Sequence, residues 1–139
     1  MALARRVELF VHVVWSTSRR RPWIRADIEG ELHNVIGAKC VEHGCIPRAI
    51  GGMADHLHLL VLLDPGMPLT KLVAEVKGSS SHAMTHRLAP GTEFQWQRGY
   101  AAFSISPDDV AAVERYVFDQ KRHHGARATD ATFEPVEDT

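Results

Sequence analysis

The stretch that decides the fold is Asp55-His56-Leu57-His58-Leu59-Leu60-Val61-Leu62. Its apolar run predicts a β-strand, in which successive side chains point to opposite faces of a sheet. His56 and His58 would therefore share one face, where two imidazoles can begin a metal site. Beyond the histidines both faces are apolar, which is typical of a central strand that is covered on both sides.

The residues around this strand predict the other elements of the order β-α-β-β-α-β-β-α. Apolar residues at three- and four-residue spacing predict helices over 24–43 and 68–86. Ser106-Pro107 followed by two acidic residues is a helix start and predicts a third helix over 107–123. β-branched and aromatic runs predict strands over 7–15, 45–53, 94–98 and 101–105. The last two would form a tight hairpin at Gly99-Tyr100, and Gly51-Gly52 would bend or bulge the second strand. This order predicts an α+β fold of the ferredoxin-like, split-βαβ kind, in which helices pack on an antiparallel sheet.

The composition is that of a globular domain, with 45% hydrophobic and 24% charged residues among 139. We expect one domain over 1–125 and a short acidic tail over 126–139. The chain lacks a run of about 18 apolar residues and a small-residue cleavage site near its N-terminus, which predicts a cytoplasmic protein without membrane contact. Cys40 and Cys45 are expected to be buried or half-buried thiols, because Cys-x4-Cys without a second pair is a poor zinc signal.

The charge distribution leaves nucleic-acid binding open. A net charge of −1 does not favour a general nucleic-acid binder. The tail holds one base, Arg127, and four acids, so the rest of the chain has 15 basic and 13 acidic residues and a net charge of +2. Basic residues cluster at Arg19-Arg20-Arg21, but such a cluster is more often a solvated face than a binding site.

The predicted helix over 107–123 places polar residues on one face. Tyr116, Gln120 and either His123 or His124 follow a spacing of three or four residues. A metal that polarises a phosphate would let Tyr116 act as a nucleophile, and Gln120 could offer its carbonyl oxygen to that metal. Two imidazoles and one oxygen leave positions open for phosphate oxygens, which suits Mg²⁺ or Mn²⁺. From the helix alone, a core position for Tyr116 and a solvated Gln120 is the stronger interpretation.

Other features leave alternatives open. Tyr100 is a rival nucleophile, and its ordinary role would be packing or stacking on a ligand. Lys77 and the serines that follow it could hold phosphates, or could form an exposed polar helix end. Trp23 and two strand tryptophans could stack on unpaired bases, although tryptophans in strands are more often part of the core.

These motifs together resemble one family, the small single-tyrosine HUH transposases of bacterial insertion sequences, including their repeat-associated domesticated relatives. The match runs from about Val7 to His124. Any one motif is weak, but five in the right order are highly specific. In chain order they are Phe10-Val11-His12-Val13-Val14-Trp15-Ser16-Thr17, Asp55-His56-Leu57-His58-Leu59-Leu60-Val61, Lys77-Gly78-Ser79-Ser80-Ser81, Trp96-Gln97-Arg98-Gly99-Tyr100 and Tyr116-Val117-Phe118-Asp119-Gln120-Lys121-Arg122-His123-His124.

The resemblance implies a definite chemistry. His56 and His58 would be paired metal ligands with Gln120 as the third, and the metal would be Mg²⁺ or Mn²⁺. Tyr116 would attack a phosphodiester in single-stranded DNA, giving a 5′-phosphotyrosine link and a 3′-OH, and strand transfer would follow. The family acts as homodimers on DNA hairpins near element ends, often with the tyrosine helix of one subunit completing the site of the other. Further residues are expected to support the metal ligands or to contact DNA, namely Asp55, Lys77, Ser79, Arg98, Lys121, His123 and His124.

Two alternatives to an active transposase fit the same residues. One is a domesticated protein that binds or processes DNA hairpins without mobile-element activity. The other is a metallohydrolase that releases its product without a covalent step. Because Tyr116 and Gln120 are both present, the residues favour the transposase.

Overall fold

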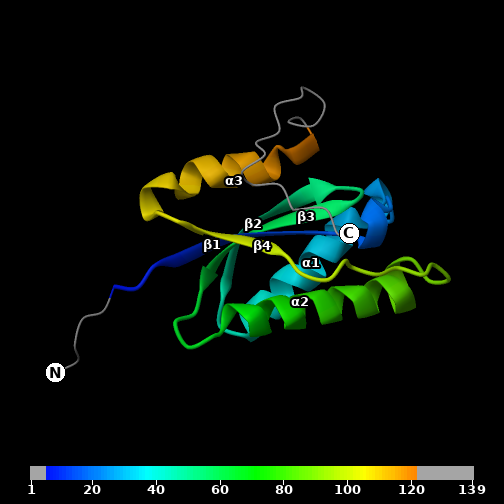
Figure 1. Cartoon of the computed structure of the whole chain (residues 1–139), viewed down its shortest axis with the longest axis horizontal. Coiled ribbons are helices and arrows are strands. Elements are labelled where there is room, and N and C mark those ends of the chain that lie inside the picture. The colour runs from blue at the N-terminus through cyan, green and yellow to red at the C-terminus, as the bar shows by residue number, and fades with distance from the viewer. Residues whose placement is uncertain (1–5, 122–139) are drawn as a thin grey trace.

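The stretch quoted above forms β3, His56–Leu63, an interior strand of a four-stranded antiparallel sheet (Figure 1). The computed structural model describes residues 6–121. The strand order in the sheet is β2-β3-β1-β4, and the other strands cover Leu9–Ser16 (β1), Ile46–Met53 (β2) and Ala101–Ile105 (β4). β3 thus has a partner strand along both of its edges, as its apolar sequence predicts.

Three α-helices complete the fold: α1 (Ala26–Glu42), α2 (Leu69–Ala83) and α3 (Val110–Phe118). Short helical turns precede or extend them, namely η1 (Ser18–Arg20), η2 (Met84–Leu88) and η3 (Pro107–Asp109). The strands and helices follow the order β-α-β-β-α-β-α. The predicted α+β class, an antiparallel sheet with helices packed on it, is confirmed.

The sheet is covered on both faces, with α1 and α2 on one side and α3 on the other (Figure 1). Leu57 and Leu59 of β3 point to the α1–α2 side and join the larger hydrophobic core there. Leu60, the next residue after Leu59, points to the opposite face and joins a second cluster on the α3 side. His56 and His58 have the same parity as Leu60, so both imidazoles lie on the α3 side.

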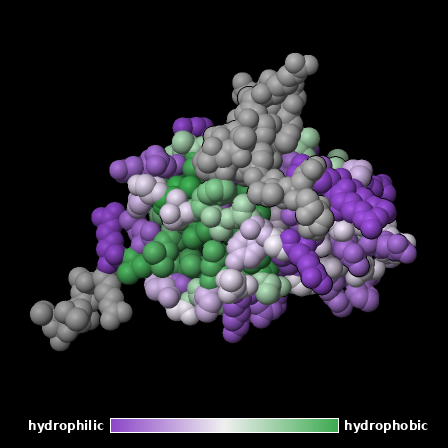
Figure 2. Space-filling view, in the orientation of Figure 1, coloured by the Kyte–Doolittle hydropathy of each residue, from purple (hydrophilic) through white to green (hydrophobic). Residues whose placement is uncertain are grey.

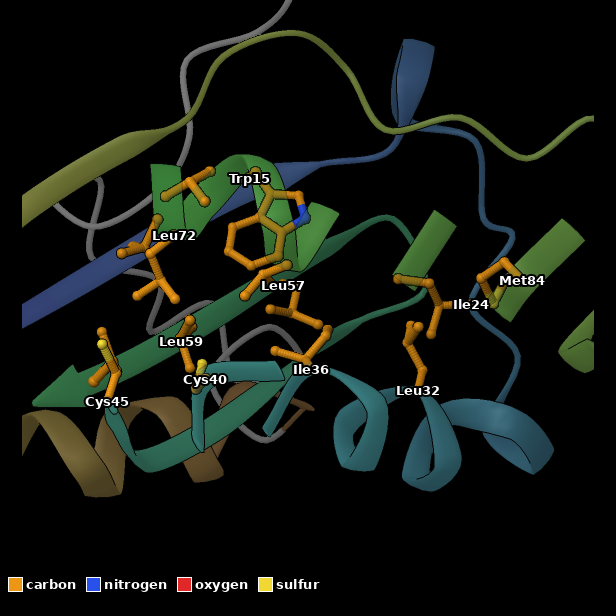
Figure 3. Close-up of a cluster of buried hydrophobic side chains, with 14 of the residues drawn as sticks. Trp15, Ile24, Leu32, Ile36, Cys40, Cys45, Leu57, Leu59, Leu72 and Met84 are labelled. Carbon is orange, nitrogen blue, oxygen red and sulfur yellow. The ribbon is translucent and has the colours of Figure 1, made fainter. Parts of the chain in front are cut away.

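The larger core gathers apolar side chains from the sheet and from two helices (Figure 3). Trp15 of β1 and Leu57 of β3 lie between Ile36 of α1 and Leu72 of α2, and all four are almost fully buried. Burial of this much apolar area is the main stabilising term of the fold, at roughly 25 cal/mol per Å². This core packs against the α1–α2 face of β3 and fixes the position of the strand. The histidines on the opposite face of β3 are therefore held in place.

The predicted hairpin over 94–105 does not form. β4 pairs with β1 instead, and the segment over 94–98 contributes only an isolated bridge between Trp96 and Thr17. Tertiary contacts explain the difference, because the Trp96 ring packs edge-on against Trp15 and its Nε1–H donates to the Ser80 hydroxyl at 2.9 Å. Packing against the core thus overrides the strand propensity of a short segment.

The Gly51-Gly52 pair does not make the predicted bulge. The irregularity in β2 lies between Pro47 and Ala49, where proline cannot donate to the sheet. Gly51 instead allows close packing, because a Cβ there would lie 2.0 Å from the carbonyl oxygen of Val117 in α3. The absence of a side chain therefore lets α3 approach the sheet.

The third helix, α3, ends at Phe118, where a turn at Asp119 interrupts the predicted helix before helical residues resume at Gln120 and Lys121. Residues 122–123 of its predicted length lie outside the described residues. The proposed boundary between a domain over 1–125 and a tail over 126–139 also lies outside them. Within the part of the chain that the structure describes, no helix has the length and apolar character needed to cross a membrane. Figure 2 shows hydrophobic residues gathered on the face where β1 begins, and Val7 and Leu9 are exposed there.

Candidate active site

Four residues that the sequence singled out come together between β3 and α3. The rings of His56 and His58 lie edge to face with centroids 5.2 Å apart, and Tyr116 of α3 lies with its ring centroid 5.6 Å from that of His58. Gln120 places its Oε1 atom 3.3 Å from Nε2 of His56. All four belong to one chain, so the structure brings together residues far apart in sequence without a second subunit.

The end of α3 explains how Gln120 reaches the site. Asp119 leaves helical geometry, and the side-chain amide of Gln120 donates to the carbonyl oxygen of Tyr116 at 3.0 Å. That bond identifies the amide nitrogen and so directs the Oε1 atom of Gln120 toward His56. Gln120 is only 1% exposed, so its interpretation as a solvated residue is wrong, whereas Tyr116 is half-buried.

Asp55 sets the orientation of His56. Its Oδ1 atom lies 2.8 Å from Nδ1 of His56, and its Oδ2 atom accepts a hydrogen bond from Nε of Arg20 at 3.2 Å. The hydrogen bond from His56, with help from the Arg20 charge, lowers the pKa of Asp55 to about 2 against the opposing effect of partial burial. Asp55 is therefore a carboxylate at neutral pH, and the Nδ1–H of His56 donates to it.

This arrangement fits a metal ion. With its hydrogen on Nδ1, a neutral His56 presents the Nε2 lone pair toward Oε1 of Gln120, which also carries lone pairs. Two acceptors that face each other at this distance suit a shared cation. Among residues 6–121 no group of three or more His, Cys, Asp or Glu side chains is arranged to hold a metal. The candidate donor set here is therefore the two imidazoles and the amide oxygen of Gln120. Two nitrogens and one oxygen are a donor set that Mn²⁺ accepts, and Mg²⁺ less readily.

His12 is a site residue that the sequence did not single out. It lies on β1, is fully buried, and places Nε2 2.8 Å from Nδ1 of His58. Its ring centroid lies 5.0 Å from that of His58 and 6.2 Å from that of Tyr116. The available signal was a histidine at an alternate position in an apolar strand, since a buried polar group needs a polar partner.

Arg20 is a second residue whose role only the structure reveals. It belongs to the basic cluster in η1, where Arg19 and Arg20 both have φ of 56°, in the left-handed region that non-glycine residues seldom adopt. Besides Asp55, Arg20 contacts the Ser16 hydroxyl at 3.3 Å. The neighbouring side chains of Arg19 and Arg21 line a cavity of about 380 Å³ with Trp23.

The other predicted residues that the structure describes make contacts of their own. Lys77 donates to the carbonyl oxygens of Gln97 and Gly99, at 2.7 and 3.0 Å. Ser79 is half-buried and Arg98 is exposed, while Lys121 pairs with Glu29 and contacts the carbonyl of Gly52. His123 and His124 lie outside the described residues. Among the alternatives, Tyr100 packs against the larger core, and the two cysteines are buried thiols without a disulfide, as predicted.

Comparison with known proteins places this geometry in context. The model of the family described as "Transposase IS200 like" matches residues 6–120. A solved structure of a candidate transposase from Deinococcus radiodurans R1 is 22% identical, with a TM-score of 0.66 and coverage of 84% of this chain and 95% of that one. A REP-associated tyrosine transposase bound to a REP hairpin is 18% identical, with a TM-score of 0.67 and coverage of 90% and 75%. No curated protein matches the chain.

Proposed function

Because this chain belongs to the IS200-like transposase family, we propose that it cleaves and rejoins single-stranded DNA through a covalent bond to Tyr116. The contact between Nε2 of His56 and Oε1 of Gln120 carries the proposal, because it brings together two of the proposed metal ligands beside the tyrosine. Tyr116 is half-buried over the histidine rings, so its phenol can be held close to a phosphate bound there.

The reaction conserves the phosphodiester bond energy. The Tyr116 oxygen attacks the phosphorus atom and forms an O–P bond, while its proton passes to solvent. The bond from phosphorus to the 3′ oxygen breaks, and that oxygen takes up a proton to become a 3′-OH. The 5′ end stays on Tyr116 as a phosphotyrosine until another 3′-OH attacks it, restores a phosphodiester and releases the phenol.

A Mg²⁺ or Mn²⁺ ion would be held by Nε2 of His56, Nε2 of His58 and Oε1 of Gln120. When bound, it would polarise the phosphate that is attacked. The chain itself contributes orientation: Asp55 holds His56, and the amide of Gln120 is tied to the carbonyl of Tyr116, so ligand and nucleophile share one helix end.

We propose hairpin-ended single-stranded DNA as the substrate and a homodimer as the working form. The hairpin is supported by the REP hairpin bound to one structural neighbour, and the dimer by the resemblance and by β4, an edge strand. Since one chain supplies both histidines, Tyr116 and Gln120, each subunit would hold its own site. The alternative is a domesticated protein of the same fold that binds or processes hairpins.

The test incubates the protein with Mn²⁺ and oligonucleotide hairpins taken from the flanks of its own gene, and resolves covalent adducts on a denaturing gel. We expect an adduct from wild type and from the control Tyr100→Phe, and none from Tyr116→Phe. An adduct with Tyr116→Phe would refute the assigned nucleophile. Hairpin binding that survives chelation, without any adduct, would favour the domesticated alternative.

Mixing two inactive variants tests the assembly of the site. If each subunit holds its own site, a mixed dimer of Tyr116→Phe and His58→Ala contains no intact site and forms no adduct. If the tyrosine helix serves the other subunit, the mixture regains activity, because one of the two sites has both parts intact. Light scattering on the same samples verifies that dimers have formed.

A further inference from the structure

His12 and His58 form a buried pair of imidazoles, of which only His58 belongs to the proposed set of metal ligands. We propose that His12 is a positioning residue, which accepts a hydrogen bond from Nδ1–H of His58 and so presents Nε2 of His58 to the metal. This inference rests on the proposed function, because it concerns the same site. It adds a third histidine whose effect on the reaction passes through His58.

The sheet register brings the two rings together. β1 pairs with β3 so that His12 lies opposite Leu60 and Val14 lies opposite His58. His12 and His58 are therefore diagonal neighbours on the face that α3 covers, within reach of each other's side chains. The distance of 2.8 Å between Nε2 of His12 and Nδ1 of His58 is that of a strong hydrogen bond.

Burial makes this bond decisive for the tautomer. Both rings have no exposed surface, so water does not compete with the protein partner. A neutral imidazole carries one N–H and one lone pair, and a contact between two ring nitrogens requires one of each. If His58 donates from Nδ1, its lone pair is on Nε2, which is the nitrogen that a metal ligand needs.

The two metal-binding histidines are then oriented in matching ways. Nδ1 of His56 donates to the carboxylate of Asp55, and Nδ1 of His58 donates to the neutral ring of His12. Each partner makes its histidine a stronger ligand and holds the ring plane in place. Tyr116 packs edge-on against both His12 and His58, with interplanar angles of 72°, so the same pair also defines where the nucleophile rests.

His12 is not itself the third ligand. Its Nε2 atom is directed at His58, and the described residues contain no metal-binding group of three or more His, Cys, Asp or Glu side chains. A ligand role and a positioning role predict different variants. A positioning residue can be replaced by another acceptor of similar reach, whereas glutamine in place of a ligand would alter the donor set.

The test compares three variants of the full chain. His12→Gln keeps an oxygen acceptor near the position of Nε2, and His12→Phe keeps a ring but removes the acceptor. Val13→Ala is the control, because Val13 is fully buried on the opposite face of β1 and belongs to the larger core. It should lower stability without touching the histidines. Circular dichroism on each variant establishes that the fold is retained.

The first readout needs no metal. Long-range ¹H–¹⁵N spectra of the apo protein should show His58 protonated on Nδ1 in wild type, His12→Gln and Val13→Ala, and shifted toward Nε2–H in His12→Phe. The second is Mn²⁺ binding, followed by the paramagnetic signal of the unbound ion. His12→Phe should bind Mn²⁺ roughly 10–100-fold more weakly, while His12→Gln and Val13→Ala stay near wild type.

Two results would overturn the inference. One is a wild-type His58 that is protonated on Nε2, and the other is a folded His12→Phe variant with the wild-type tautomer. If wild type itself fails to bind Mn²⁺, the metal role in the proposed function is wrong. The tautomer spectra still decide whether His12 orients His58, so the two failures are distinguishable.

Discussion

The Oε1 atom of Gln120 lies 3.3 Å from the Nε2 atom of His56, although the two residues are 64 positions apart in the chain. Gln120 follows the turn at Asp119 that ends α3, and His56 is the first residue of β3. Because Asp55 accepts the hydrogen on Nδ1 of His56, the neutral form of His56 turns the lone pair of Nε2 toward this oxygen. A cation shared by these two atoms would stabilise this contact.

Removing the Gln120 oxygen should weaken Mn²⁺ binding. The variant Gln120→Leu keeps the side chain buried but leaves only two ligands, and we expect affinity to fall roughly tenfold or more, since losing even a partner of a ligand has effects of that size. Gln120→Glu supplies an anionic oxygen and should bind Mn²⁺ at least as tightly as wild type. Titration calorimetry with Mn²⁺ alone measures the affinity of both variants. An unchanged affinity in Gln120→Leu would exclude Gln120 as a ligand.

A methyl group at Gly51 should separate the two halves of the site. A Cβ there would lie 2.0 Å from the Val117 carbonyl, so Gly51→Ala must move α3 away from the sheet. We expect a loss of about 1–3 kcal/mol in the free energy of unfolding and little or no adduct at Tyr116. The matched control is Gly30→Ala in α1, where a Cβ meets nothing within 4 Å and should stabilise by about 0.5–1 kcal/mol. Urea denaturation measures the stability of both variants, and a denaturing gel measures their adduct yield. Equal stability and equal adduct yield in the two variants would contradict the role of Gly51 in close packing of α3.

Lys77 should act mainly on the loop over 97–99. Its ammonium donates to two backbone carbonyls there, so Lys77→Met should lower the free energy of unfolding by about 1 kcal/mol. The salt dependence of binding to a single-stranded oligonucleotide should then stay at its wild-type slope. A slope reduced by about one would instead show that Lys77 contacts a phosphate, as the resemblance implies.

Cys40 should resist thiol reagents in the folded protein. Burial in the core raises the pKa of its thiol to about 12, so the reactive thiolate is scarce at pH 8 and increases only as the pH approaches that value. We expect an aromatic disulfide reagent at pH 8 to modify Cys40 only as fast as the protein unfolds, and immediately in denaturant. In the folded Cys40→Ser control, any rapid modification would come from Cys45. Rapid modification of the Cys40 thiol in folded wild type would contradict its burial.

Much of the fold was predictable because its signals are local. The alternation around His58 predicts a strand with both imidazoles on one face, and the structure places them so. The spacing of Tyr116 and Gln120 predicts a shared side of a helix, whereas Gln120 lies beyond the end of α3 and is held near Tyr116 by a side-chain hydrogen bond to its carbonyl. The predictions that failed concern residues whose positions depend on contacts with distant segments. Trp96 packs on the core and does not form the predicted strand, and Gly51 allows close packing of α3 and does not form a bulge.

The amino-acid sequence by itself determined which chemical groups are present and which face of its own element each one takes, since side-chain periodicity follows from backbone geometry alone. Only the tertiary structure decided that the α3 face of β3 meets the end of α3 within one chain. It also decided that His12 supports His58 and that Arg20 holds Asp55. These pairings depend on sheet register and helix docking, which arise from packing between residues far apart in the sequence, and no local pattern encodes them.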